Sequence, residues 1–274
     1  MKKITLILTL AFLSSVVFQS CDKNNGLTPP QTTPTNPTSS ISVEQKNMGL
    51  IFKFTGTNCY YCGDWGWTMF KDLTTQFHKK DAVCIAAYSQ NNFAKLLVSP
   101  IATDFDRKVP VSKGYPTFTG NFVDAWSGGN TFAGMNNVIS TNVNNHKNAE
   151  VVANTGFNST ITGNEMTIET NTKFFKSAEG EYYLGVYLLE DGIVASQSGP
   201  KAGPNAVHDN VLRGGNASWG ELLTSGSIEA NKNFEKTIKI TLDPTWNNSK
   251  LSVFTILWKK NGANYDFVNA YIKG

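Results

Sequence analysis

The chain has 274 residues, with 24 lysines and arginines against 21 aspartates and glutamates, and 40% of its residues are apolar. It is long enough to bury the cores of two domains, which is the number we expect. The near balance of charge excludes the basic surface that binds nucleic acid, so no nucleic-acid partner is expected.

The N-terminus has the features of an export signal. Two lysines precede the apolar run Ile4 to Phe18, which is too short for a stable membrane span, so residues 1–20 are predicted to be a signal peptide. The end of this run and the following Cys21 resemble a bacterial lipobox. That resemblance implies that Cys21 is lipidated and becomes the mature N-terminus. An ordinary signal peptide is the alternative.

Residues 21–46 are expected to be the lipidated N-terminus and a disordered tether. The stretch from Asp22 to Ser42 is rich in Pro, Thr, Ser, Gln and Asn. It has too little apolar surface to offset the conformational entropy that ordering would cost. The N-terminal region therefore predicts a protein attached by its lipid to a membrane of the bacterial cell envelope.

The next segment is organised around a Cys-x-x-Cys pair, Cys59 and Cys62. Met48 to Phe54 is short and apolar, as expected of a buried strand, and apolar residues recur at helical spacing from Phe70 to Phe77. The cysteines therefore lie where a strand passes into a helix, whose free N–H groups stabilise a thiolate. We expect Cys59 to be the exposed, attacking thiol and Cys62 to be the shielded, resolving thiol inside the first helical turn.

Further elements complete a known pattern. A second strand is predicted over Ala82 to Tyr88, a short helix around Phe93 to Val98, and then the sequence Tyr115-Pro116-Thr117. This order resembles the thioredoxin superfamily. The resemblance implies an α/β thioredoxin-like domain over residues 47–148, a cis bond before Pro116, and a substrate groove formed by Tyr115, Pro116 and Thr117.

The pair departs from the thioredoxin pattern in ways that affect its chemistry. Tyr60 and Tyr61 replace the usual Gly-Pro, and Lys53 replaces the usual buried acid. A lysine that faces the pair favours the Cys59 thiolate by Coulomb attraction, but a protonated amine cannot deprotonate Cys62. These departures do not favour efficient general reductase activity.

Two other interpretations of the cysteine pair stay open. The Cys59–Cys62 bond can be an inert structural disulfide, which an exported compartment permits. A structural zinc site needs four ligands, whereas the chain has three widely separated histidines. We therefore expect no metal and no cofactor.

Cys84 lies in an apolar strand and is expected to be a buried structural thiol.

From about residue 150 the sequence takes on the two-residue period of β-strands. Ile238 to Leu242 alternates apolar with polar residues, and Asn261-Gly262 is a strong hairpin signal. We expect an all-β antiparallel sandwich over residues 150–274. The segment Gly199 to Gly215, which is rich in Gly, Pro and Asn, is predicted to be a long loop.

A polar motif lies inside that segment. The sequence from Val207 to Arg213, together with Phe54 to Cys59, resembles the outer-membrane-protein-28-related lipoproteins. This resemblance covers nearly the whole mature chain and implies an outer-membrane lipoprotein of a Gram-negative bacterium, without a known reaction. His208, Asp209 and Arg213 are expected to be hydrogen-bonded anchors, because a catalytic His-Asp pair would need a nucleophile that the sequence does not identify.

Two functions are consistent with these observations. The first is a tethered protein that exchanges thiols and disulfides with exported proteins through Cys59 and Cys62. The second is a non-enzymatic outer-membrane binding or adhesion lipoprotein, in which the thioredoxin fold is a scaffold and the disulfide is structural. In that case the sandwich, or the groove beside Pro116, binds a peptide or a glycan. The fold alone does not decide between them.

Overall fold

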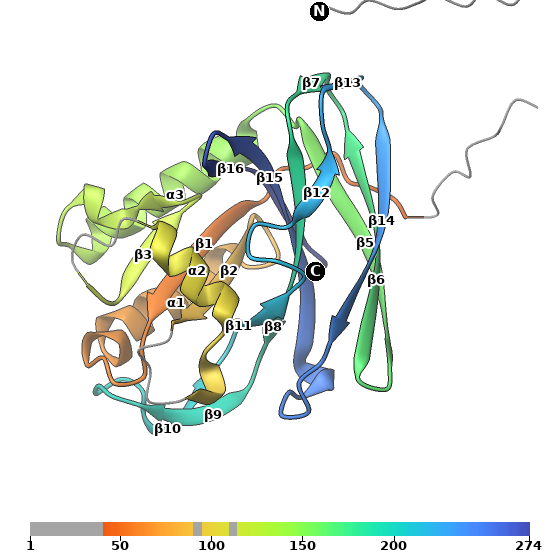
Figure 1. The fold of residues 1–274 in the computed structure, drawn as a ribbon. Coiled ribbons are helices and arrows are strands. Elements are labelled where there is room, and N and C mark those ends of the chain that lie inside the picture. Colours follow the sequence, from red (N-terminus) through yellow and green to blue (C-terminus); the bar gives the residue numbers. More distant parts are fainter. Residues whose placement is uncertain (1–40, 90–94, 110–113) are drawn as a thin grey trace, which may run out of the picture. The chain divides into compact units, whose positions relative to one another are not determined.

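The computed structural model describes residues 41–89, 95–109 and 114–274 (Figure 1). The predicted signal peptide, Cys21 and the rest of the chain up to residue 40 lie outside these residues. The helices are α1 (Trp65–Phe77), α2 (Pro100–Lys108) and α3 (Phe132–Asn148), with one-turn helices η1 (Tyr61–Gly63), η2 (Lys95–Leu97), η3 (Ala125–Gly128) and η4 (Asn248–Lys250). In the described ranges no helix has the length and apolar character of a membrane span.

β-Strands are the predominant regular structure of the described chain. The strands are β1 (Gly49–Thr55), β2 (Ala82–Tyr88), β3 (Thr117–Gly120), β4 (Val123–Asp124), β5 (Ala153–Thr162), β6 (Glu165–Phe174), β7 (Ala178–Glu179), β8 (Tyr182–Glu190), β9 (Ile193–Gln197), β10 (Gly203–His208), β11 (Val211–Gly215), β12 (Glu221–Thr224), β13 (Ser227–Ile228), β14 (Asn233–Thr241), β15 (Leu251–Asn261) and β16 (Asn264–Ile272). The prediction of a β-rich fold is confirmed.

A nine-stranded sheet contains strands from both halves of the chain (Figure 1). Its order is β16-β15-β8-β11-β2-β1-β3-β4, and β12 also pairs with β8. β1 and β2 are parallel, with α1 as the crossover between them, whereas β3 is antiparallel to β1. β11 joins the two halves, because Val211 lies opposite Ala86 of β2 and opposite Glu190 of β8.

Alternate residues of β1 enter different cores, as the two-residue period of a strand requires. Phe52 packs on one face of the sheet in a cluster that includes Phe105 of α2. Ile51 points to the other face and packs with Leu73 of α1 and Ile139 of α3. The sheet around β1 is therefore covered by helices on both faces.

A second sheet packs against the large one. β14, β6 and β5 form a three-stranded antiparallel sheet. Its residues Ile168 and Ile238 share a buried cluster with Val186 of β8 and Val253 of β15. The C-terminal segment thus has two β layers, but one of them belongs to the sheet that also holds β1 and β2. The division into domains at residues 148–150 stays a prediction.

The prediction of a long loop over Gly199–Gly215 is wrong. This segment contains β10 and β11. Val211 and Leu212 are fully buried, and the gain from burying them between β2 and β8 outweighs the low strand propensity of the surrounding glycines and asparagines.

The last residues of the predicted tether have a fixed position. The side-chain amides of Asn171 and Asn154 donate hydrogen bonds to the backbone oxygens of Ile41 and Glu44, at 3.1 and 3.0 Å. Residues 41–46 are thereby attached to β5 and β6, and a disordered tether cannot include them.

We expect Phe254→Ala to destabilise both halves of the large sheet together. The Phe254 ring is fully buried, lies 5.1 Å from the ring of Tyr187, and belongs to the cluster that contains Phe52 and Phe105. The free energy of unfolding should fall by about 3–5 kcal/mol, measured by urea denaturation with amide hydrogen exchange in β1 as a second probe. Val194→Ala alters a side chain that is 60% exposed, and this control should change the free energy by less than about 0.5 kcal/mol. Unchanged exchange in β1 would instead indicate two independent domains.

Candidate functional site

Cys59 and Cys62 form a disulfide in the loop after β1, with their Cα atoms 5.2 Å apart. Cys62 is fully buried and Cys59 is half-buried, so the predicted difference in exposure is confirmed. The backbone N–H of Cys62 donates to Sγ of Cys59 at 3.1 Å. Such a bond strengthens when the sulfur carries negative charge. The accessible sulfur is therefore also the one with a donor in place.

The helix after the pair begins later than the sequence predicted. Cys62 lies in η1, and α1 begins only at Trp65, because Asp64 has non-helical angles of φ −109° and ψ −111°. The expectation that Cys62 lies in the first turn of the main helix is wrong. The donor at Cys59 is the N–H of Cys62 in the one-turn helix, not an N–H at the start of α1.

The segment Tyr115-Pro116-Thr117 lies beside the disulfide. The Tyr115–Pro116 bond is cis, as the resemblance to thioredoxins implied, and the carbonyl oxygen of Tyr115 is 3.5 Å from Sγ of Cys59. A β-carbon on Gly66 would lie 2.5 Å from Cγ of Pro116, so glycine permits this close contact with α1. Thr117 is fully buried and does not present its side chain to a groove.

The hairpin of β9 and β10 covers the cysteine loop, and the sequence reasoning missed it. Gln197 is buried, and its Nε2 lies 3.0, 3.2 and 3.2 Å from the carbonyl oxygens of Gly56, Thr57 and Cys59. The backbone N–H of Ser198 donates to Thr57 at 2.7 Å. These bonds fix the loop that carries the disulfide. A single glutamine belongs to no sequence motif, so no signal pointed to it.

Lys53 is buried beneath α1, next to the disulfide. Its Nζ lies 3.3 Å from the carbonyl oxygen of Cys62 and 5.0 and 5.5 Å from the ring centres of Trp67 and Phe70. It forms no ion pair with any carboxylate of the described residues. Burial therefore lowers the pKa of Lys53 to about 7.

This pKa changes what Lys53 can do. Near neutral pH roughly half of the molecules carry a neutral amine at this position. A neutral amine accepts a proton, so the expectation stated for a protonated lysine does not apply to the neutral fraction. That expectation assumed an ordinary lysine pKa, because the sequence does not reveal that the side chain is fully desolvated.

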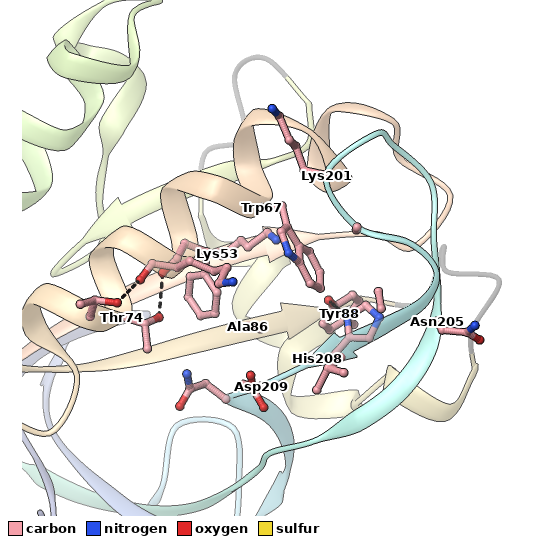
Figure 2. Close-up of a pocket in the computed structure, with 16 residues that line it drawn as sticks. Lys53, Trp67, Thr74, Ala86, Tyr88, Lys201, Asn205, His208 and Asp209 are labelled. Carbon is pink, nitrogen blue, oxygen red and sulfur yellow. Dashed lines mark hydrogen bonds between the residues drawn. The ribbon is translucent and has the colours of Figure 1, made fainter.

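Lys53 also lines a pocket with a volume of about 380 Å³, between α1 and the β9–β10 hairpin (Figure 2). His208 forms part of its wall. The hydroxyl of Tyr88 donates to Nδ1 of His208 at 2.7 Å, and Nε2 of His208 lies 3.3 Å from the carbonyl oxygen of Ala195. The proton of the imidazole is therefore on Nε2. Burial lowers the pKa of His208 to about 4, so the ring is neutral.

The other polar residues of the motif are anchors, as predicted. Asp209 accepts a hydrogen bond from the N–H of Gly192 at 2.9 Å. Arg213 forms a buried ion pair with Glu190, with 3.0 Å between Nε and Oε2. Cys84 is fully buried in β2, where desolvation raises the pKa of its thiol. The prediction that Cys84 is a structural thiol is confirmed.

The chain matches three solved structures of bacterial proteins at low sequence identity. HBP35 of Porphyromonas gingivalis is 16% identical with a TM-score of 0.64, over 85% of this chain and 76% of that chain. Protein AGR_C_4864 from Agrobacterium tumefaciens is 14% identical with a TM-score of 0.50, over 84% of this chain and 96% of that chain. A domain of the outer membrane lipoprotein Omp28 from Porphyromonas gingivalis is 16% identical with a TM-score of 0.32, over 45% of this chain and 87% of that domain. The first two likenesses concern the fold alone, and the third is too slight to carry an argument.

Sequence comparison identifies the family. No curated protein matches the chain significantly. The family model for outer membrane protein Omp28 matches residues 111–270, which is more than half of the chain. The matched range includes Pro116, the β9–β10 hairpin and β11, and it begins after the cysteine pair. A match to this family supports a location in the cell envelope. The chain therefore belongs to the Omp28 family of outer membrane proteins.

Proposed function

We propose that this protein exchanges thiols and disulfides with exported proteins through a thioredoxin-like domain. The observation that carries the proposal is the half-buried Cys59, whose sulfur has the Cys62 N–H as a donor and the carbonyl oxygen of Tyr115, the residue before Pro116, 3.5 Å away. The order of the first elements supports the assignment of the fold. β1 and β2 are parallel around α1, β3 is antiparallel to β1, and a buried proline precedes β3.

The exchange takes two steps. With the pair reduced, the Cys59 thiolate attacks a substrate disulfide, so that a mixed disulfide forms and one substrate thiolate leaves. The Cys62 thiolate then attacks the Cys59 sulfur, which releases the second substrate thiolate and forms the Cys59–Cys62 disulfide. The substrate gains the two electrons that the pair loses. The same steps in reverse oxidise a substrate dithiol.

Lys53 serves as the base for the resolving step. It is hydrogen-bonded to the backbone of Cys62, and burial gives it a pKa of about 7. In its neutral form Lys53 accepts the proton of the Cys62 thiol, and once protonated it stabilises the thiolate that remains. Lys53 thereby takes the place of the buried acid that is usual in the thioredoxin pattern, and it is cationic rather than anionic when charged.

Tyr60 and Tyr61 provide a contact surface for the substrate protein. They stand next to Cys59 with 56% and 60% of their surface exposed. Exposed aromatic side chains beside a reactive group are a common means of holding a partner. The Tyr115 carbonyl oxygen is 3.5 Å from Sγ of Cys59.

A second function is favoured by the hydrogen bonds of the hairpin. Gln197 and Ser198 hold the loop at Gly56, Thr57 and Cys59, and a loop fixed in this way suits a structural disulfide. In that case the protein is a binding or adhesion lipoprotein. The thioredoxin-like part is then a scaffold, and the β layers or the groove beside Pro116 bind a peptide or glycan.

Trapping experiments test the roles of the two cysteines. Cys62→Ser should accumulate a mixed disulfide through Cys59, because the resolving thiol is gone, whereas Cys59→Ser should trap little, because Cys62 is fully buried. Trapped partners are detected on non-reducing gels after free thiols are alkylated and are identified by mass spectrometry. Cys84→Ser is the control and should trap no more than the wild type. More trapping by Cys59→Ser than by Cys62→Ser would reverse the assignment.

The reduction potential of the pair separates the two functions. A disulfide that takes part in exchange should have a potential between about −270 and −120 mV, whereas a structural disulfide lies below about −300 mV. The potential is measured by equilibrating the protein with thiol redox buffers and quantifying alkylated Cys59 and Cys62. A value below the structural limit, together with the absence of trapped partners, would favour the scaffold function.

We also propose that the lipid on Cys21 anchors the protein in the outer membrane. Cys21→Ser should remove the acyl chains and shift the protein from the membrane fraction to the soluble envelope fraction. Membrane fractionation and mass spectrometry of the N-terminal peptide measure this change. An unmodified N-terminal peptide in the wild type, or an unchanged distribution of the variant, would contradict the proposed anchor.

A further inference from the structure

We propose that the pocket beneath the β9–β10 hairpin binds a small organic monocarboxylate with an aromatic or branched apolar body, and that Lys53 pairs with its carboxylate (Figure 2). This binding site is additional to thiol-disulfide exchange and does not depend on it. The proposal rests on the charge, the shape and the lining of the pocket.

No carboxylate of the described residues pairs with the buried cation of the pocket, Lys53. Lys53 is 1% exposed, and within the described residues its ammonium group donates to one backbone oxygen, that of Cys62. An ammonium group has three donors, and a buried one is stable only when it is paired and hydrogen-bonded. A carboxylate in the pocket would supply both the counter-charge and the missing acceptors.

The other charged groups of the pocket also favour an anion. Lys71 and Lys201 are exposed residues of the lining, and Asp209 is the acidic one. The Asp209 carboxylate accepts a hydrogen bond from the N–H of Gly192. Three lysines against one aspartate give the lining a net positive charge, which attracts anions.

The side chains that line the walls of the pocket indicate which uncharged body the ligand has. Trp67, Phe70, Tyr88 and the neutral His208 ring contribute to the lining, and the rings of Trp67 and His208 meet edge to face at 5.2 Å. A pocket of about 380 Å³ lies at the small end of the range for ligand sites. These features fit a compact apolar or aromatic body that carries one charged group.

Phosphate groups fit the pocket less well than a carboxylate. The part of α1 that lines the pocket runs from Trp67 to Thr75, and of these residues Trp67 lies in the first turn of the helix, which begins at Trp65. The N–H of Trp67 already donates to the carbonyl oxygen of Asp64 at 3.1 Å, so the described lining does not offer the array of free N–H groups with which helix N-termini bind phosphate. A single buried lysine matches the single charge of a carboxylate.

Isothermal titration calorimetry on the full chain in its disulfide form tests the proposal. At pH 6.5 phenylacetate or indole-3-acetate should bind with a dissociation constant below about 1 mM, and phenylacetamide should bind at least about tenfold more weakly. Inorganic phosphate should bind more weakly than either acid. No binding of either acid, equal binding of the amide, or tighter binding of phosphate would each overturn the proposal. The disulfide form makes the result independent of whether the cysteines exchange.

Lys53→Met tests the role of the lysine. Methionine keeps an unbranched side chain of similar length and removes the buried charge, so the variant should fold, which circular dichroism checks. Phenylacetate affinity should fall by roughly 30-fold or more. Lys71→Met removes an exposed lysine of the same pocket, and this control should lose about fivefold at most. Equal losses in the two variants would contradict pairing with Lys53.

The pH dependence of the wild-type affinity provides a test that needs no variant. Burial lowers the pKa of Lys53 to about 7, lowers that of His208 to about 4 and raises that of Tyr88. Lys71, Lys201 and Asp209 are the remaining charged groups of the lining. Above pH 7 a carboxylate must take up a proton at Lys53 to bind, so its affinity should fall by up to about tenfold per pH unit. A constant affinity between pH 6.5 and 8.5 would overturn the proposal.

Discussion

The pairing of β11 determines how the candidate site is built. Val211 lies between Ala86 of β2 and Glu190 of β8, and this single strand turns two sets of strands into one sheet. Val211 and Leu212 are fully buried, which contributes roughly 1.5–3 kcal/mol for each side chain. Because only two residues separate the end of β10 from the start of β11, the β9–β10 hairpin is held over α1. The hairpin then reaches the cysteine loop through Gln197 and closes the pocket with His208.

The local features of the site could be predicted from the sequence. The apolar run of β2, the loop with Cys59 and Cys62, and the proline at 116 all follow from short stretches whose residue types admit few alternatives. The start of α2 is also marked in the sequence. Ser99 caps this helix by accepting from the N–H of Ala102, and Pro100 occupies its first turn.

The parts that could not be predicted depend on contacts between distant segments. β10 and β11 contain three glycines, one asparagine and one proline, which favour a loop. β10 is a strand because it pairs with β9, and β11 is a strand because it pairs with β2 and β8. Gln197 acts through its position next to three carbonyl oxygens, which no periodicity encodes. The pKa of Lys53 likewise follows from its burial beneath Trp67 and Phe70, and not from its place in a motif.

Burying Lys53 in this core costs stability when its amine is charged. A fall in its pKa from 10.5 to about 7 corresponds to a penalty on the order of 5 kcal/mol for the charged form. The unfolded chain binds the proton more tightly, so stability rises with pH between about 7 and 10.5. A methionine would fill the same space without this cost.

The two proposed roles of Lys53 oppose each other. As a base for Cys62, its nitrogen must be neutral, whereas pairing with a carboxylate in the pocket requires the ammonium form. Both roles use the same atom, which lies 3.3 Å from the Cys62 backbone. An occupied pocket would therefore hold the proton on Lys53 and remove the base from the resolving step. In this arrangement the binding of a small acid in the pocket directly affects the deprotonation of Cys62 and therefore the chemistry of the cysteine pair.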